Sequence, residues 1–264
     1  MGLYTFIAWL FRLGWRVLGL DVHSRGHHNI PQRGPAILAS NHVGYLDFCF
    51  VALAAPKPRR QVRFVARHDI FEKPVVGWVL RRLRQIPVDV HGDPTPALAE
   101  AETKLRAGEV IGMHPEGTIS PSFVPRPGRT GTVRLAHETG APIVPVAIWG
   151  SQRLLTKGRP VKLRRGLAVV VRYGQPFTPA SDDPVEATAE LMERITRLLA
   201  QAQAEYPQQP DPGDDWWLPH HLGGSAPTPE EAEERIRRQV EERRRRAEEE
   251  GRRRRDEGEG RAAG

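Results

Sequence analysis

Cysteine, lysine and long apolar runs are scarce in this chain of 264 residues. Cys49 is the single cysteine, so no disulfide can form within one chain, and a reducing, cytosolic setting fits this composition. Lysine occurs 5 times against 34 arginines, an imbalance that GC-rich codon usage accounts for. No segment reaches the ~20 consecutive apolar residues that a spanning helix requires. Any contact with a membrane is therefore expected to be peripheral.

Several sequence signatures of catalysis are also missing. The chain has no G-x-S-x-G nucleophile elbow, no Walker-type phosphate loop, no dinucleotide fingerprint and no H-E-x-x-H zinc pair. Its histidines do not have the spacing of metal ligands, so no metal site is predicted. We interpret six of them as surface or loop residues: His27, His28, His91, His114, His220 and His221.

The net charge of +7 resides in residues 1–229, because residues 230–264 contain equal numbers of acidic side chains and arginines. A basic folded region favours an anionic partner: a nucleic acid, an anionic membrane or a phosphorylated substrate. No nucleic-acid partner is predicted, since no recognised nucleic-acid motif is present and no aromatic residues are interleaved with the arginines. Residues 230–264 are expected to form a charged, partly disordered tail. Residues 207–229 are expected to be an irregular segment, docked on the domain through Trp216-Trp217-Leu218.

Short apolar runs alternate with helical patterns between residues 21 and 206. Such alternation predicts an α/β fold, in which a single domain has a central, mostly buried sheet flanked by helices. Strands are expected near residues 36–40, 63–66, 86–88, 109–113, 142–148 and 167–173. Helices are expected near residues 46–55, 74–84, 93–108, 130–138 and from 183 onward.

Residues 1–20 are predicted to form an N-terminal helix at the membrane interface. The segment is apolar but too short to span a bilayer, and Trp9 and Trp15 suit the headgroup region. Arg12 and Arg16 are spaced i and i+4 on one helical face. The alternative is a helix packed on the domain with its arginines outward. No basic n-region or cleavage site suggests a signal peptide, so the expected location is the cytoplasmic face of the cell membrane, as a peripheral protein.

Two polar clusters contain the candidate catalytic residues. The first runs from Asn41 to Asp47 and includes His42, and the second runs from His114 to Thr118. A carboxylate near a histidine fixes its tautomer and stabilises the imidazolium, so the pair can act as a general base. His42 and Asp47 can meet only if the chain turns between them, which Gly44 makes plausible. Without an obvious nucleophile, such a base would activate a substrate hydroxyl directly.

Each cluster also has a structural interpretation. A His-x4-Asp spacing taken alone is common by chance and favours a structural histidine. Glu116, on the tight turn Pro115-Glu116-Gly117-Thr118, could simply bond backbone amides. Both clusters follow predicted strands, which is where α/β proteins place ligands.

Together the motifs resemble the glycerolipid acyltransferase family, of which the 1-acyl-sn-glycerol-3-phosphate (lysophosphatidate) acyltransferases are typical members. The resemblance covers about residues 20–200, beginning with Asn41 and the HX4D motif of His42 and Asp47. Residues 64–71 are similar to the second family block, with Arg67 and Asp69 where the family has lysine and glutamate. Residues 115–118 and 129–146 are similar to the later blocks.

The resemblance implies a membrane-associated O-acyltransferase of phospholipid synthesis. His42, oriented by Asp47, would deprotonate a hydroxyl of lysophosphatidate or a related glycerolipid, which then attacks the thioester of acyl-CoA or acyl-carrier protein. The implied partners are a membrane lipid surface, the lysophospholipid acceptor and the acyl donor, and neither a metal nor an organic cofactor is implied. The implied substrate-binding residues are Asn41, Arg67, Glu116, Gly117, Thr118 and Arg129.

Two positions depart from the family pattern. Ile119 and Val90 stand where the family often has arginines that help to bind phosphate. Either Arg126, Arg129 or His91 compensates, or the acceptor is a different lipid alcohol. The alternative to an enzyme is a non-catalytic lipid-binding protein on the same scaffold. The pairing of His42 with Asp47 argues against it, because a binding module has no need of a general base.

Overall fold

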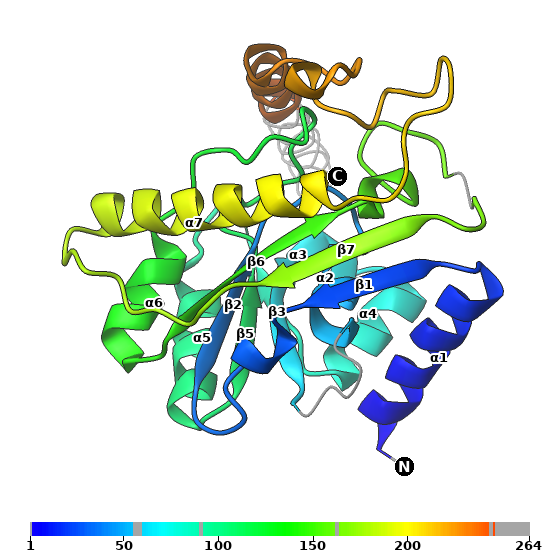
Figure 1. Cartoon of the computed structure of the whole chain (residues 1–264). Coiled ribbons are helices and arrows are strands. Elements are labelled where there is room, and N and C mark those ends of the chain that lie inside the picture. Colours follow the sequence, from blue (N-terminus) through cyan, green and yellow to red (C-terminus); the bar gives the residue numbers. More distant parts are fainter. Residues whose placement is uncertain (1, 55–59, 90–91, 162–163, 243–244, 246–264) are drawn as a thin grey trace, which may run out of the picture.

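A seven-stranded sheet forms the centre of the fold in a computed structural model, which describes residues 2–54, 60–89, 92–161, 164–242 and 245 (Figure 1). This arrangement confirms the predicted α/β class with a central sheet flanked by helices. In spatial order the strands are β1 (Asp21–Arg25), β7 (Ala168–Tyr173), β6 (Ile143–Trp149), β2 (Ala36–Ser40), β5 (Val110–Met113), β3 (Val62–Arg67) and β4 (Ile86–Val88).

The sheet is mixed in direction. Strands β6, β2, β5, β3 and β4 run parallel, whereas β7 is antiparallel to β6, and β1 at the edge is parallel to β7. Strand β1 was not predicted, because its sequence Asp-Val-His-Ser-Arg is mostly polar and is only partly buried at the sheet edge. The carboxyl ends of β2 and β5 are adjacent, with Ala39 paired to Met113. The two polar clusters therefore leave the sheet side by side.

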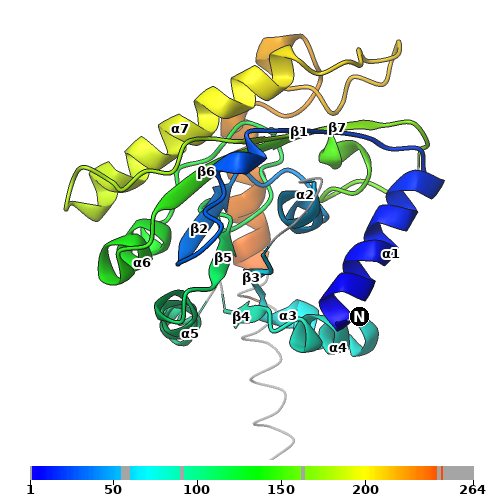
Figure 2. The ribbon, with the colours of Figure 1, turned by 60° about the horizontal axis from the view of Figure 1, so that its bottom comes forward.

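Helices cover both faces of the sheet (Figure 2). One face is covered by α5 (Thr95–Arg106), α6 (Gly131–Thr139) and α7 (Pro184–Ala204). The other is covered by α1 (Leu3–Val17) and α2 (Asp47–Leu53), with α3 (His68–Phe71) and α4 (Pro74–Arg82) near the β3–β4 edge. Side chains alternate along β2, so that Ile37 and Ala39 enter one core while Ala36 and Leu38 enter the other. Short 3-10 turns lie at His27–Asn29, Ser151–Arg153 and His220–Leu222.

Helix α1 packs on the domain with one face and leaves an apolar face open. Trp15 stacks on Phe50 at 4.7 Å between ring centroids, and the Arg12 guanidinium donates to the Leu53 carbonyl at 2.9 Å. Arg12 thus points toward the domain rather than outward, and Trp15 is a packing residue. The opposite face exposes an apolar stripe of Leu3, Phe6, Trp9, Leu10, Leu13 and Val17. Within the described ranges, every helix is too short or too polar to cross a bilayer.

The chain after α7 returns to the domain instead of leaving it. Trp217 is 1% exposed and packs against Trp149 and Tyr206. Residues 229–242 then form a helix, which begins with a reciprocal capping pair between Thr228 and Glu231. Ala232 on this helix is buried, so this part of the predicted charged tail is docked on the domain. The rest of the predicted tail, apart from residue 245, lies outside the described residues.

Candidate active site

The register of β2 against β5 brings His42 and Glu116 together. The offset that pairs Ala39 with Met113 also places His42 opposite Glu116, beyond the ends of the two strands. The His42 amide donates to Glu116 Oε1 at 2.8 Å, and the His42 carbonyl accepts from the Ser120 amide at 3.0 Å. The two polar clusters, 74 residues apart in sequence, therefore form one site.

His42 and Asp47 are in direct contact, as the sequence predicts. The distance from His42 Nδ1 to Asp47 Oδ2 is 2.9 Å, and the same oxygen accepts from the amides of Val43 and Gly44. Asp47 Oδ1 accepts from the Ser151 hydroxyl at 2.5 Å. The carboxylate is 0% exposed, whereas the His42 side chain is 20% exposed. Hydrogen bonds to both oxygens thus hold the buried Asp47 carboxylate in place, whereas the imidazole that it orients reaches solvent.

Gly44 and Ser151 complete this arrangement. A Cβ atom at Gly44 would lie 3.0 Å from the Leu155 carbonyl oxygen and 3.2 Å from that of Ser151. Glycine thus lets the turn after His42 pack tightly against residues 151–155. Ser151 was not identified from the sequence. The available signal was its place two residues after the end of β6, a strand that lies next to β2.

Glu116 is turned toward the protein main chain. One carboxyl oxygen accepts from the His42 amide, and the other accepts from the Arg126 amide at 3.0 Å. Only 2% of the residue is exposed, and this burial raises the pKa of Glu116 to about 8. Glu116 therefore connects the turn after β2 to the loop around Arg126, in agreement with the structural interpretation of this turn acid.

His114 lies in the loop directly after β5, as predicted, but it is also part of the site. Its ring stacks on that of His42 with centroids 4.1 Å apart and planes 9° from parallel. The Ser40 hydroxyl lies 3.0 Å from His114 Nδ1, and Phe64 lies nearby at 5.8 Å between centroids. Burial, together with the neighbouring His42, lowers the pKa of His114 to about 3. His114 is accordingly a neutral ring packed against the candidate base.

Asn41 lies between β2 and β6 and bonds the main chain of β6. Its amide nitrogen donates to the Ile148 carbonyl at 3.0 Å, and its amide oxygen accepts from the Ile148 amide at 2.8 Å. The residue is 1% exposed. Because both ends of its side chain bond the main chain of β6, Asn41 connects two strands, and its role in substrate binding stays a prediction.

Gly117 and Arg129 lie against each other at the second turn. Gly117 has a positive φ of 69°, and a Cβ atom there would lie 3.0 Å from Arg129 Nε. The missing side chain thus makes room for the guanidinium, and Thr118 follows directly, half-buried. The substrate-binding roles of Gly117, Thr118 and Arg129 stay predictions, but the three residues do share one location.

Arg67 lies at the end of β3, the strand next to β5. Its guanidinium makes two hydrogen bonds to Asp69, at 3.0 and 2.6 Å, and this pair is solvent-exposed. The predicted role of Arg67 in binding phosphate therefore requires the acceptor to replace or join Asp69.

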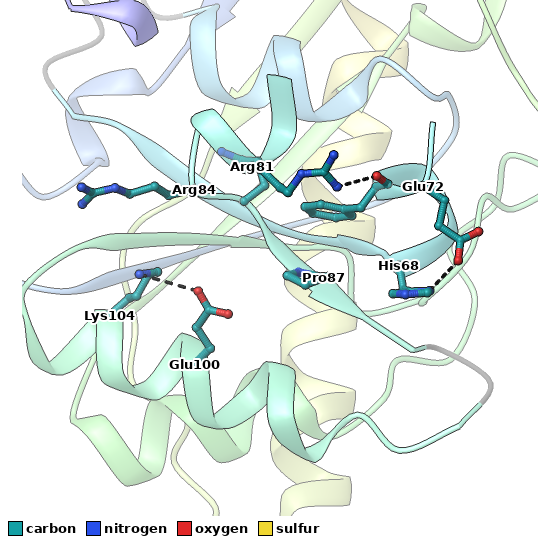
Figure 3. Close-up of a pocket in the computed structure, with 9 residues that line it drawn as sticks. His68, Glu72, Arg81, Arg84, Pro87, Glu100 and Lys104 are labelled. Carbon is teal, nitrogen blue, oxygen red and sulfur yellow. Dashed lines mark hydrogen bonds and ion pairs between the residues drawn. The ribbon is translucent and has the colours of Figure 1, made fainter. Parts of the chain in front are cut away.

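A separate open cavity of about 490 Å³ lies beside the edge strand β4 (Figure 3). His68, Arg81 and Lys104 are among its lining residues, with Pro87 between them in the view. Lys104 is paired with Glu100 and His68 with Glu72, while the Arg81 guanidinium donates to the Phe71 carbonyl at 2.7 Å. Neither His42 nor Glu116 lines this cavity. In the described part of the chain, no cluster of His, Cys, Asp and Glu side chains could hold a metal ion.

Comparison with known proteins identifies the family. A family model described as Acyltransferase matches residues 21–149, the region that contains both polar clusters. These residues belong to the acyltransferase family. The crystal structure of the 1-acyl-sn-glycerophosphate (LPA) acyltransferase PlsC from Thermotoga maritima is similar, with a TM-score of 0.64 and 27% identity. That match covers 76% of this chain and 80% of PlsC.

Curated sequences agree with this assignment. The 1-acyl-sn-glycerol-3-phosphate acyltransferase of Bacillus subtilis is 28% identical over 145 residues, which is 53% of this chain and 69% of that enzyme. The chloroplastic enzyme BAT2 of Brassica napus is 25% identical over 181 residues, or 65% of this chain. The chain spans about half of the Brassica enzyme, 51% of its length. The predicted relationship to glycerolipid O-acyltransferases is confirmed.

Proposed function

We propose that this chain transfers a fatty acyl group from acyl-CoA or acyl-carrier protein to a hydroxyl of lysophosphatidate or a related glycerolipid. The product would be phosphatidate or its analogue, for phospholipid synthesis. The observation that carries the proposal is the pairing of His42 Nδ1 with the buried Asp47 carboxylate, in a chain of the acyltransferase family. Three named relatives, from Bacillus subtilis, Brassica napus and Thermotoga maritima, are lysophosphatidate acyltransferases by name.

The chemical step follows from which histidine nitrogen Asp47 holds. With the Nδ1 proton donated to Asp47, Nε2 has the lone pair that can accept a proton from the acceptor hydroxyl. The oxygen forms a bond to the thioester carbonyl carbon, and the carbon–sulfur bond of the resulting tetrahedral intermediate breaks. His42 then returns its proton to the departing thiolate. Asp47 stabilises the transient imidazolium, and no metal or organic cofactor is needed in this scheme.

The acceptor side of the site is proposed to include the turn from Glu116 to Thr118 and the guanidinium of Arg129, with Arg67 farther along the sheet edge. Ile119, where the family often has arginine, is 3% exposed and belongs to the packed interior. Val90, the second departure, lies outside the described residues. The acceptor's phosphate therefore needs cations other than those at the usual positions.

Peripheral binding to a lipid surface is proposed to bring the site to its substrate, at the cytoplasmic face of the cell membrane. The apolar stripe on α1 supports this, because its exposed side chains repeat at helical spacing on the face directed away from the domain. The net charge of residues 1–229 favours anionic lipid.

The test of the reaction is acyl transfer from labelled acyl-CoA to lysophosphatidate by the purified full chain. His42→Ala is expected to lower kcat by about 10³-fold or more, because the general base is lost. His221→Ala, at an exposed histidine far from this pair in sequence, is the matched control and should retain activity. A parallel panel of lipid alcohols identifies the acceptor.

Two results would overturn parts of this proposal. Unchanged turnover in His42→Ala would rule out the base mechanism. If the chain binds lysophospholipid but transfers no acyl group from either donor to any acceptor, it is a lipid-binding protein on an acyltransferase scaffold.

A further inference from the structure

The guanidinium of Arg126 is occupied by a carboxylate from the C-terminal helix. Arg126 Nε donates to Glu233 Oε1 at 2.5 Å, and Arg126 Nη2 donates to Glu233 Oε2 at 2.9 Å. The planar fork of the arginine thus holds both oxygens of a planar anion. The two residues are 107 positions apart, and Glu233 lies beyond the region matched by the acyltransferase family.

The same guanidinium lies at the edge of the candidate active site. Its Nη1 is 3.5 Å from the Glu116 carbonyl oxygen, and the Arg126 amide donates to the Glu116 carboxyl. On the same turn, Arg129 Nε would lie 3.0 Å from a Cβ atom at Gly117. Two guanidiniums therefore adjoin the turn that bonds the main chain of His42.

The Glu233 carboxylate can leave the Arg126 guanidinium while the helix stays on the domain. The Glu233 side chain is 47% exposed, so water can replace the arginine around its carboxylate. The helix of residues 229–242 has other contacts that hold it, including the buried Ala232. Just before the helix, Trp216 packs against Phe123 and under the guanidinium of Arg159. Release of Glu233 therefore does not require the segment to leave the domain.

We propose that Arg126 binds the phosphate monoester of the acceptor lipid, and that Glu233 is a built-in competing carboxylate that occupies the same fork when no acceptor is bound. A phosphate monoester has a charge near −2 and three acceptor oxygens, so it outcompetes a single carboxylate for a guanidinium. This inference rests on the proposed function and deepens it. In this scheme the helix of residues 229–242, through Glu233, helps to select acceptors that have a phosphate, together with the family-matched region.

The test measures binding separately from turnover. Equilibrium dialysis of the full chain with labelled lysophosphatidate, below its micelle concentration, is compared with dialysis of the phosphate-free 1-acylglycerol. Arg126→Gln is expected to weaken lysophosphatidate binding at least 10-fold and to change 1-acylglycerol binding less than 2-fold. Glu233→Gln is expected to tighten lysophosphatidate binding 3- to 10-fold. The matched control is Glu234→Gln on the same helix, where the carboxylate pairs locally with Arg237 and Arg238, and it should change nothing.

A double-variant cycle separates competition from simple anchoring. If Glu233 acts by occupying Arg126, Glu233→Gln has less than a 2-fold effect in the Arg126→Gln background. Weaker lysophosphatidate binding in Glu233→Gln, or equal losses for both lipids in Arg126→Gln, would show that the pair only anchors the helix and would overturn the proposal. Selective binding without any acyl transfer would instead leave this inference standing and remove the proposed reaction.

Discussion

Around Asp47, each carboxylate oxygen already has a donor before any substrate arrives. A buried carboxylate is costly unless it is paired and hydrogen-bonded, and here His42, two amides and the Ser151 hydroxyl compensate it. Asp47 also begins α2, where the helix dipole favours a negative charge. The orientation of the His42 ring is thus determined by several bonds, which is the preorganisation that general-base catalysis requires.

Glu116 is buried like Asp47 and accepts hydrogen bonds from two backbone amides, and its burial leads to a prediction on pH. Its pKa is raised to about 8 in the folded protein, against 4.5 in an unfolded chain. Between these pH values the native state holds a proton that the unfolded state has lost, so the free energy of unfolding should fall as pH rises. The expected slope from this group is up to about 1.4 kcal/mol per pH unit.

Urea unfolding of the wild type and of Glu116→Gln from pH 4.5 to 8 measures this slope. The glutamine cannot titrate, so the variant should lose the slope, although it is less stable at low pH because one backbone amide loses its acceptor. Glu100→Gln, on the exposed part of α5, is the control and should keep the wild-type slope. An equal slope in Glu116→Gln would mean that Glu116 is ionised in the fold.

At the scale of secondary-structure elements, α1 and α4 lie on the same side of the molecule in both views (Figures 1 and 2), and both helices expose apolar side chains. On α4 these are Val75, Val76 and Trp78, with the Arg82 guanidinium over the Trp78 ring. Apolar side chains beside arginines suit the boundary between acyl chains and anionic headgroups. The interfacial role predicted for α1 would thus be shared with a second helix.

Replacing Leu10 and Leu13 together by Glu is predicted to weaken binding to vesicles of phosphatidylglycerol and phosphatidylcholine by at least 10-fold. Two exposed leucines lose their transfer into the interface, and two negative charges face an anionic surface. Vesicle sedimentation measures the loss. Val185→Glu, at an exposed apolar position on α7, should bind as the wild type does. Equal binding by the Leu10 and Leu13 double variant would exclude α1 as the membrane contact.

At the scale of the whole molecule, the segment around Trp217, which lies beyond the family-matched region, contributes to the packed interior. Trp217 contacts Trp149 and Tyr206, and the Arg153 guanidinium lies 4.3 Å from its ring centroid. Arg153 is the last residue of the 3-10 turn that begins at Ser151. The segment that contains Trp217 therefore supports the turn of residues 151–153, whose Ser151 hydroxyl donates to Asp47.

Trp217→Ala is predicted to lower the free energy of unfolding by about 3–5 kcal/mol, the typical cost of emptying a buried aromatic site. Urea unfolding at constant pH measures this change. Leu222→Ala, at an exposed position in the same segment, should change it by less than about 0.5 kcal/mol. A small effect of Trp217→Ala would indicate that residues 207–229 are an accessory and not part of the folded core.

The amino-acid sequence by itself determined the local elements and the chemical candidates. The predicted helices and most strands are present within a few residues of their expected bounds, because apolar periodicity and Pro or Gly breaks act locally. The contact of His42 with Asp47 also follows from a short segment with a tight turn. Strand β1 escaped prediction because an edge strand needs little apolar patterning to pair with its neighbour.

The tertiary structure alone decided which distant residues meet. Pairing of β2 with β5 stacks His114 on His42 and places Glu116 against the His42 amide, and pairing of β2 with β6 occupies both ends of Asn41. The docking of residues 229–242 places Glu233 on Arg126. These contacts depend on strand register and on the return of the chain across the sheet. Both are determined by many weak interactions between distant residues, which leave no local pattern in the sequence.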